Sequence, residues 1–370
     1  MKASPERKAL HGLDGVGSTA QHALGTIYSA AVVHIRLDGD VVFEEAFGAR
    51  RPGAPATAPD CLFDLASITK LFTTTALLAL FDRRRFALDD PITVVMPEFA
   101  GTDARRAQVS YRHLLTHTSG LPAYANYREE SGPAAIIARI CATPLVSRPG
   151  SEVLYSDLGF MLAGALIERI WGAPLDQALH ELVASPMQLS DLCFRPEPQL
   201  LRQVVCTEND PRRKRLLRGE VHDENAWAMG GAAGHAGLFG SAEAVADLAE
   251  MYRRGGPAPE PVLMRPTARA ATRLQADGAE RRGLGWALHG PGSSCGDLLS
   301  PEAYGHTGYT GTSVWVDPQR ALTVVLLTNR VHVSRDPEPI RQFRIAMHDA
   351  VVHDLERGGA FAKRGGAFSG

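Results

Sequence analysis

The stretch Ser67-Ile-Thr-Lys70, followed by the apolar run from Leu71 to Leu80, is the most informative part of this sequence. Residues i and i+3 share one face of a helix, so this spacing brings a hydroxyl and an amine together at the start of a predicted helix. A serine hydroxyl is a weak nucleophile until a neighbouring group takes its proton. Burial lowers the pKa of a lysine, so Lys70 is the predicted base for Ser67.

The rarity of lysine strengthens this interpretation. Only 5 of the 39 basic residues are lysines, and Lys70 is the one that sits in an apolar context. Arginine stays protonated and cannot serve as a base, so a lysine at this position has a chemical reason. The alternative is a helix lysine that extends its charged end to solvent.

The composition is that of a globular protein with a full hydrophobic core. The chain has 370 residues, of which 45% are hydrophobic, with a formal net charge of −2 and a pI of about 6.7. These values exclude a disordered or fibrous chain. Because no basic field is present, nucleic acid is not an expected partner.

The sequence predicts a cytoplasmic location. The stretch from Met1 to Lys8 lacks the apolar segment of a signal peptide, and no run approaches the roughly 18 apolar residues of a membrane span. The five cysteines are odd in number, widely spaced and without a CxxC pair, which argues against a disulfide framework or a thiolate zinc site. No metal or other cofactor is predicted.

Periodicity places strands at both ends of the chain and helices between them. Helices are predicted over 9–24, 67–85, 133–142, 156–171, 174–184, 241–254 and 338–356, and strands over 29–37, 41–47, 284–289, 305–310, 313–317 and 322–328. This order predicts an α/β (α+β) fold. Residues 1–66 and 256–357 would form a sheet lobe, 67–255 a mostly helical lobe, and 358–370 a flexible tail.

Three further segments stand out, although each has an ordinary interpretation when taken alone. Tyr155-Ser-Asp157 opens a predicted helix, and His306-Thr-Gly308 lies on a predicted strand that continues to Tyr309. The third is the polar loop from Leu114 to Pro122, with the sequence LLTHTSGLP. Taken alone, they would be a surface aromatic residue, a strand with a bend of small residues, and an ordinary loop.

Together, and in this order, the segments resemble the serine penicillin-recognising family, which includes class C β-lactamases, D,D-peptidases of penicillin-binding-protein type and related esterases. The phrases PGSEVLYSDLGF at 149–160 and GHTGYTG at 305–311 are also similar to that family, and the resemblance covers nearly the whole chain. It implies an antiparallel sheet flanked by helices, a mostly helical second lobe, and an active site in the cleft between them.

The resemblance also implies a role for each matching residue. Ser67 would be the acylating nucleophile and Lys70 would take its proton or hold the proton network that does. Tyr155 would relay the proton to the leaving group and activate water for deacylation. The backbone N–H groups of Ser67 and Tyr309 would form the oxyanion hole.

Substrate would meet the two later triplets, Asp157 in one and His306, Thr307 and Gly308 in the other. The family usually has asparagine where this chain has Asp157, and lysine where it has His306. Both changes predict a less cationic pocket that favours neutral esters over anionic β-lactams. Lowering the pH toward 6 is expected to protonate His306, and an alternative role for Asp157 is an ion pair with Lys70.

The predicted function is therefore a serine hydrolase that forms an acyl-enzyme on Ser67, in the first place an esterase. The alternatives are a D,D-carboxypeptidase or weak β-lactamase, and, in another class, a non-catalytic penicillin-binding or sensing protein. The expected partners are a small-molecule ester, a β-lactam or a D-Ala-D-Ala-type peptide, and the oligomeric state stays open. His222, Asp223 and His235 are weighed as metal ligands, but a structural role is preferred for them.

Overall fold

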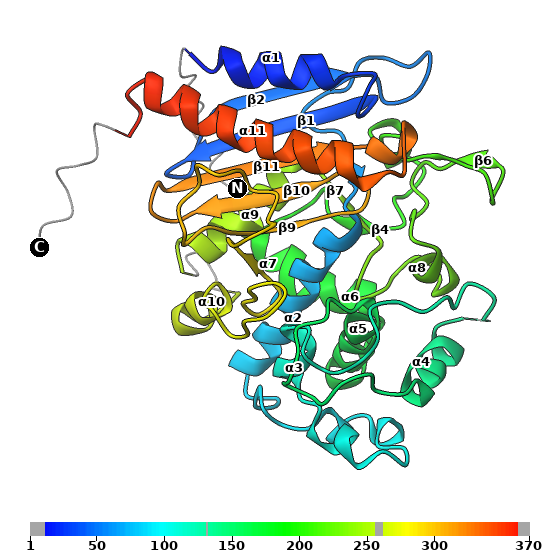
Figure 1. Cartoon of the computed structure of the whole chain (residues 1–370). Helices are drawn as coiled ribbons and strands as arrows, with labels where there is room; N and C mark the ends of the chain where they lie inside the picture. Colours follow the sequence, from blue (N-terminus) through cyan, green and yellow to red (C-terminus); the bar gives the residue numbers. More distant parts are fainter. Residues whose placement is uncertain (1–11, 131, 256–261, 362–370) are drawn as a thin grey trace, which may run out of the picture.

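The computed structural model describes residues 12–130, 132–255 and 262–361. Its main feature is a six-stranded sheet with the order β2-β1-β11-β10-β9-β8 (Figure 1). β1 (Ala30–Leu37) and β2 (Asp40–Gly48) form the hairpin predicted around Asp38 and Gly39. Asp38 adopts a left-handed backbone with φ 56°, as a tight hairpin turn requires.

The other four strands come from the C-terminal quarter of the chain. They are β8 (Ala287–Leu288), β9 (Tyr304–Thr307), β10 (Ser313–Asp317) and β11 (Leu322–Thr328). β11 pairs with β1, so that Leu327 lies opposite Val32, and every pairing in this sheet is antiparallel. The predicted fold class is confirmed, with one antiparallel sheet assembled from both ends of the chain.

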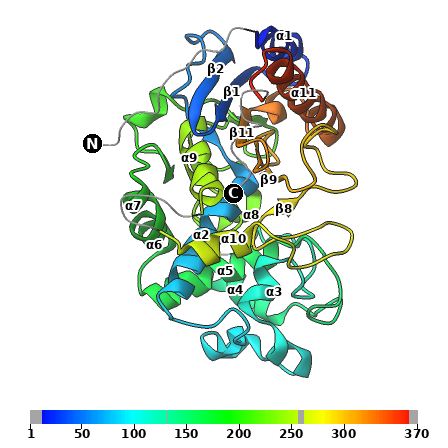
Figure 2. The same ribbon diagram turned by 90° about the vertical axis from the view of Figure 1, so that its left-hand side faces the viewer.

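Both faces of the sheet are buried, which explains why its central strands are mostly hydrophobic. Successive side chains of a strand point to opposite faces. Leu326 of β11 accordingly packs in one core with α1 (Asp14–Ala23) and α11 (Pro337–Arg357), whereas Leu327 packs in the other core with α2 (Thr69–Asp82) and α9 (Ala242–Arg253). Figure 2 shows α1 and α11 on one side of the sheet and α9 on the other.

The helical part of the molecule surrounds α2, which is buried on all sides from Thr69 to Leu80 (Figure 1). Its other helices are α3 (Tyr111–Leu115), α4 (Pro133–Ala142), α5 (Asp157–Trp171), α6 (Leu175–Leu179), α7 (Ser185–Met187), α8 (Glu224–Ala228) and α10 (Arg265–Ala271). The lobe boundaries at 67 and 256 stay a prediction. α9 packs on the sheet even though its residues fall within the range predicted for the helical lobe.

Some elements differ from the sequence prediction for local reasons. A small sheet of β3 (Phe63–Asp64), β7 (Leu238–Gly240) and β4 (Cys193–Phe194) was not predicted, because strands of two or three residues show no period. A further two-stranded ribbon joins β5 (Asn209–Asp210) and β6 (Arg215–Leu216). β8 is shorter than the predicted strand 284–289.

The short β8 follows from Gly285. This residue has φ 75°, and a Cβ added to it would lie 2.8 Å from the Cβ of Thr74 in α2. The chain therefore leaves the strand conformation here in order to approach α2 closely.

Two predicted features extend beyond the described residues. The first part of the helix predicted over 9–24 and most of the flexible tail predicted over 358–370 lie outside them. Within the described part, no single helix has both the length and the apolar composition needed to cross a membrane. One bent pair, Asp157–Trp171 with Leu175–Met187, meets that test only when the two helices are taken together.

Candidate active site

Ser67 lies in a tight turn between β3 and α2. The short helical turn Ala66–Ile68 leads directly into α2. Ala66 has φ 47°, a conformation that costs an alanine on the order of 1–2 kcal/mol, and the Asp64 carboxylate accepts the Ala66 amide at 2.9 Å. The turn places Ser67 at the N-terminal end of α2, where the helix dipole favours negative charge.

Lys70 is completely buried one helical turn after Ser67. Its Nζ lies 2.9 Å from Ser67 Oγ, 3.1 Å from the carbonyl oxygen of His235 and 2.8 Å from Asp157 Oδ1. Burial lowers the pKa of Lys70, but the charge of Asp157, with Tyr155, outweighs burial, so the net effect is a raised pKa. The expectation that burial leaves Lys70 with a lowered pKa is therefore wrong, because Asp157 forms an ion pair with it, and its role as the base stays a prediction.

Tyr155 lies between two cations. Lys70 Nζ is 4.9 Å from the centre of the Tyr155 ring, and the guanidinium carbon of Arg282 is 5.2 Å from it. Burial raises the pKa of Tyr155, although the charge of Lys70 and hydrogen bonds with Lys70 and Ser67 oppose this shift. The phenol is therefore protonated at neutral pH and lies within the hydrogen-bond network of the predicted nucleophile.

The segment that carries Tyr155 and Asp157 is fixed by the residue between them. Ser156 is the N-cap of α5: its hydroxyl oxygen accepts the Gly159 amide at 3.2 Å and its O–H donates to the Pro122 carbonyl at 2.7 Å. The Ser156 amide donates to Nδ1 of His117 at 3.0 Å, and the His117 ring lies 4.5 Å from the Tyr155 ring. The polar loop 114–122 therefore holds in place the segment that carries Tyr155 and Asp157.

His306 lies on β9 beside Tyr155, with ring centres 6.1 Å apart. Its Nδ1–H donates to the Thr307 carbonyl at 2.8 Å, and its buried Nε2 has no partner among the described residues. Burial lowers the pKa of His306 well below the usual value, and the charges of Arg282 and Lys70 lower it further. The expectation that pH 6 protonates His306 is therefore wrong.

The rest of the last triplet packs directly on the turn that carries Ser67. A Cβ added to Gly308 would meet the hydroxyl of Thr312 and lie 2.7 Å from the Leu65 carbonyl oxygen, so only glycine allows this approach. The Tyr309 amide, predicted to belong to the oxyanion hole, follows immediately and has no hydrogen-bond acceptor among the described residues. The side chain of Tyr309 is 48% exposed and stacks on the ring of His222.

Arg282 is a residue of the site that the sequence analysis missed. It is only 3% exposed, its Nη2 pairs with Glu280, and its Nε and Nη1 have no partner among the described residues. It supplies a permanent positive charge beside Tyr155 and His306. The pocket is therefore more cationic than was expected from the replacement of the family lysine by His306. No motif marks this position, and it lies 215 residues (282 − 67) from Ser67.

His222, Asp223 and His235 do not converge on one point. His222 pairs with Glu208 at 2.8 Å, whereas His235 pairs with Asp223 at 2.8 Å. Burial raises the pKa of Asp223, but its partner His235 and the charge of Lys70 lower it well below the usual range. No cluster of three potential metal ligands occurs in the described part of the chain.

The geometry defines a class of protein: a serine hydrolase of the penicillin-recognising superfamily. The model of the Beta-lactamase family matches residues 21–346. The chain belongs to the Beta-lactamase family.

Known proteins similar to this chain agree with that placement. A relative from Escherichia coli strain K12 named "Putative D-alanyl-D-alanine carboxypeptidase" is 33% identical over 347 residues, which cover 82% of this chain and 79% of the relative. The structure of a penicillin-binding protein homologue from Caulobacter crescentus has a TM-score of 0.75 and 21% identity, covering 94% of this chain and 98% of its own.

The structure of EstCE1, described as a hydrolase with promiscuous acyltransferase activity, gives a TM-score of 0.73 at 23% identity. The alignment covers 91% of this chain and 97% of that one. Both structural likenesses concern the fold.

Proposed function

We propose that this serine hydrolase is a D,D-carboxypeptidase, which cleaves a peptide-like amide whose leaving group carries a free carboxylate. The observation that carries the proposal is Arg282, a buried guanidinium with two unpartnered nitrogens beside Tyr155. Such a group attracts a carboxylate strongly, because the charge of arginine is permanent and its surroundings screen it weakly. The relative at 33% identity, named as a carboxypeptidase of this kind, supports the same substrate class.

In the proposed reaction, the enzyme reacts in the form in which Lys70 is neutral: Ser67 Oγ attacks the substrate carbonyl, and its proton passes to Lys70 Nζ. The backbone N–H groups of Ser67 and Tyr309 would stabilise the oxyanion. The proton then goes to the leaving amine, the acyl–Ser67 ester forms, and the D-amino acid departs. Water, whose proton would pass through the Tyr155 hydroxyl to the neutral Lys70, would hydrolyse the ester and restore Ser67.

A neutral ester is the second candidate substrate. It is favoured by Asp157, since an ionised carboxylate cannot donate a hydrogen bond to a substrate amide carbonyl as asparagine can. The neutral His306, which replaces the lysine usual in the family, also favours a neutral substrate. The roles of the site residues and the predicted cytoplasmic location stay predictions.

Substrates that differ in charge distinguish a D,D-carboxypeptidase from an esterase. We expect the wild-type enzyme to hydrolyse an N-acylated peptide ending in D-Ala-D-Ala with a higher kcat/KM than the same peptide with an amidated C-terminus. Arg282→Gln should lower kcat/KM for the free acid by about tenfold, which corresponds to roughly 1.4 kcal/mol, and leave a nitrophenyl ester within about twofold. Arg139→Gln, an exposed substitution on α4, is the matched control.

The opposite pattern would reject the proposal. If the ester is hydrolysed and the D-Ala-D-Ala peptide is not, the enzyme is an esterase. If Arg282→Gln affects the acid, the amide and the ester equally, Arg282 maintains the site rather than recognising a carboxylate.

A further inference from the structure

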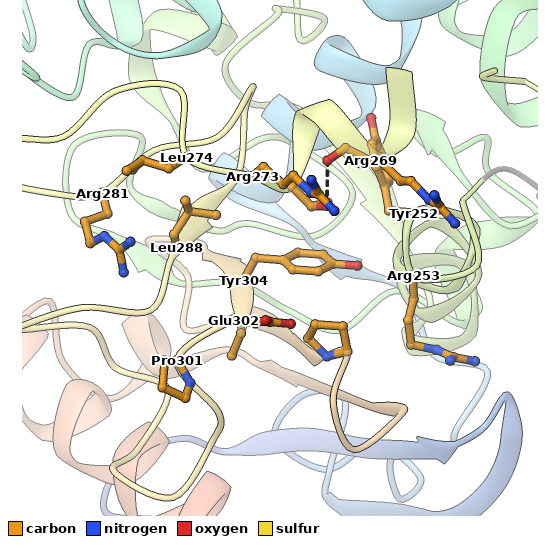
Figure 3. A pocket seen from close by; sticks show the side chains of 13 residues that line it. Tyr252, Arg253, Arg269, Arg273, Leu274, Arg281, Leu288, Pro301, Glu302 and Tyr304 are labelled. Atoms are coloured by element: carbon orange, nitrogen blue, oxygen red, sulfur yellow. Dashed lines mark hydrogen bonds between the residues drawn. The ribbon is translucent and has the colours of Figure 1, made fainter. Parts of the chain in front are cut away.

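A cavity of about 560 Å³ opens at the β8 edge of the sheet, between α9, α10 and the segment around β8 and β9 (Figure 3). Neither Ser67, Lys70 nor Tyr155 lines it. Its size is within the range that small ligands occupy in proteins. It is therefore a separate compartment from the candidate active site.

Four arginines contribute to the walls of this cavity, and Glu302 is the one carboxylate that lines it. These arginines are Arg253, Arg269, Arg273 and Arg281. They enter from different directions: Arg253 from α9, Arg269 and Arg273 from α10 and the turn after it, and Arg281 from the segment before β8 (Figure 3).

These arginines are only partly neutralised by their described neighbours. Arg253 pairs with Glu250 at 2.7 Å, and Arg281 donates to the His289 carbonyl at 3.0 Å. Arg269 and Arg273 form no ion pair with any described residue. Arg269 is on α10 and Arg273 lies in the turn after it, so two positive charges without a carboxylate partner among the described residues line the cavity.

A buried hydroxyl adds a second, independent sign of a ligand. Tyr304 is only 2% exposed, and its hydroxyl has no partner among the described residues. Figure 3 shows the Tyr304 ring in the middle of the cavity, with the hydroxyl directed toward the side where Arg253 and Arg269 lie. A phenol left without a partner in a buried site is costly, and an anionic oxygen would accept its proton in a hydrogen bond.

We propose that this cavity, here called the arginine cavity, binds a small molecule that carries a phosphate ester or pyrophosphate group. The guanidinium fork matches two phosphate oxygens at once, and arginines on several sides suit a group with more than one negative charge. Tyr304 donates one further hydrogen bond to the same group. Binding involves no covalent step.

The arginine cavity adjoins the candidate active site through two short stretches of chain. Arg281 lines the cavity while Arg282 faces Tyr155, and Tyr304 lines the cavity while His306, two residues later on β9, faces Tyr155. Binding in the cavity is nevertheless independent of the hydrolase function proposed above, because no residue of the nucleophile network takes part. The test can therefore be made on an enzyme without activity.

The experiment is isothermal titration calorimetry with pyrophosphate, and separately with inorganic phosphate, at about 0.15 M salt. The proteins are the full chain, its Ser67→Ala form, and single variants of the cavity. We expect Ser67→Ala to bind pyrophosphate as the wild type does. Arg273→Gln and Arg281→Gln should each weaken binding about tenfold, Arg273→Lys less, and Tyr304→Phe about threefold.

The matched control is Arg139→Gln, which removes the same charge from an exposed position on α4 and should leave the affinity unchanged. Circular dichroism of each variant confirms that it is folded. The proposal is overturned if neither phosphate nor pyrophosphate binds below about 1 mM. It is also overturned if Arg139→Gln weakens binding as much as Arg273→Gln, because the anion would then respond only to net charge.

Discussion

Lys70 holds the central position among the individual residues, because its amine contacts both Ser67 and Asp157. The ion pair with Asp157 at 2.8 Å holds the lysine in its charged form, whereas acceptance of the Ser67 proton needs the neutral form. The neutral fraction therefore rises with pH toward the raised pKa of Lys70. If Lys70 is the base, acylation should rise with pH in the same way.

Asp157→Asn tests this coupling. Removing the carboxylate removes the main charge that raises the pKa of Lys70 and leaves the burial that lowers it. The alkaline rise of kcat/KM should move to lower pH by about 1–3 units, the usual effect of one close opposite charge. Asp176→Asn, at a distant pair with Arg195, should leave the profile in place. A profile that keeps its position in Asp157→Asn would exclude Lys70 as the titrating base.

Among the individual residues, those that belong to a sequence motif, such as Ser67 and Lys70, could be predicted. Arg282, which belongs to no motif, was missed. Ser67 and Lys70 are one helical turn apart, so their contact follows from helix geometry alone. Asp157 was predicted to meet either substrate or Lys70, and the structure pairs it with Lys70. Arg282 could not be predicted, because its place beside Tyr155 depends on how the β8 segment packs against the helical lobe.

The turn between β9 and β10 is the element that joins the sheet to the segment that carries Ser67. The hydroxyl of Thr310 donates to the Asp64 carbonyl at 2.8 Å, and that of Thr312 donates to the Leu65 carbonyl at 3.1 Å. On the other side, Arg344 of α11 donates to the carbonyls of Gly308 and Thr312. The turn is thus held between α11 and the residues that precede Ser67.

Gly308→Ala should disturb this contact directly. The new Cβ would lie 2.7 Å from the Leu65 carbonyl oxygen and 3.3 Å from the Ala66 Cβ, and backbone atoms cannot move aside cheaply. We expect a loss of about 1–3 kcal/mol in the free energy of unfolding, measured by urea denaturation, together with a fall in kcat.

Gly17→Ala in α1 is the control for this change. Its nearest neighbour, Glu45, lies 3.5 Å away, and alanine favours the helix, so stability should stay the same or rise slightly. If Gly308→Ala is as stable and as active as the wild type, the packing of the turn on the nucleophile does not constrain the site.

Elements were predictable where they are long. The strands over 313–317 and 322–328 and the helix over 133–142 occur with the predicted bounds, because their hydrophobic patterns extend over several periods. β3, β4 and β7 contain only two or three residues each, so pairing with distant strands defines them. The contacts of β3 and β7 nevertheless set the geometry of the turn before Ser67.

In the molecule as a whole, several histidines are buried, in the helical part as well as at the sheet. Burial lowers the pKa of His117 and His306 well below the usual value and that of His348, in α11, to about 4. In the unfolded chain each of them titrates near 6.5. The stability that these neutral histidines contribute is therefore complete above about pH 6.5 and is lost as the pH falls toward the folded-state values.

The free energy of unfolding should consequently decrease between pH 7.5 and pH 5. Each histidine that stays neutral adds a slope of up to about 1.4 kcal/mol per pH unit below pH 6.5. Urea denaturation at several pH values measures the slope. His348→Leu should reduce it by the share of one histidine, whereas Gln342→Leu, a change at an exposed position on the same helix that removes no titrating group, should not. A stability independent of pH over this interval would contradict the account.

The arrangement of the whole chain was predictable because strands at both ends with helices between them indicate one sheet built from both termini. The antiparallel pairing of that sheet was expected from the resemblance to the family. The packing of α9 on the sheet was not predicted. Its apolar face could pack equally well against a helix or a sheet, and the sequence pattern does not show which of the two is its partner.

The proposed acyl-enzyme forms on Ser67, and covalent labelling of the protein shows whether this serine reacts. The protein is incubated with an active-site-directed fluorophosphonate, and its intact mass and its peptides are then determined by mass spectrometry. We expect a single adduct on the peptide that contains Ser67, and none in Ser67→Ala. An adduct on another residue, or labelling that persists in Ser67→Ala, would contradict it.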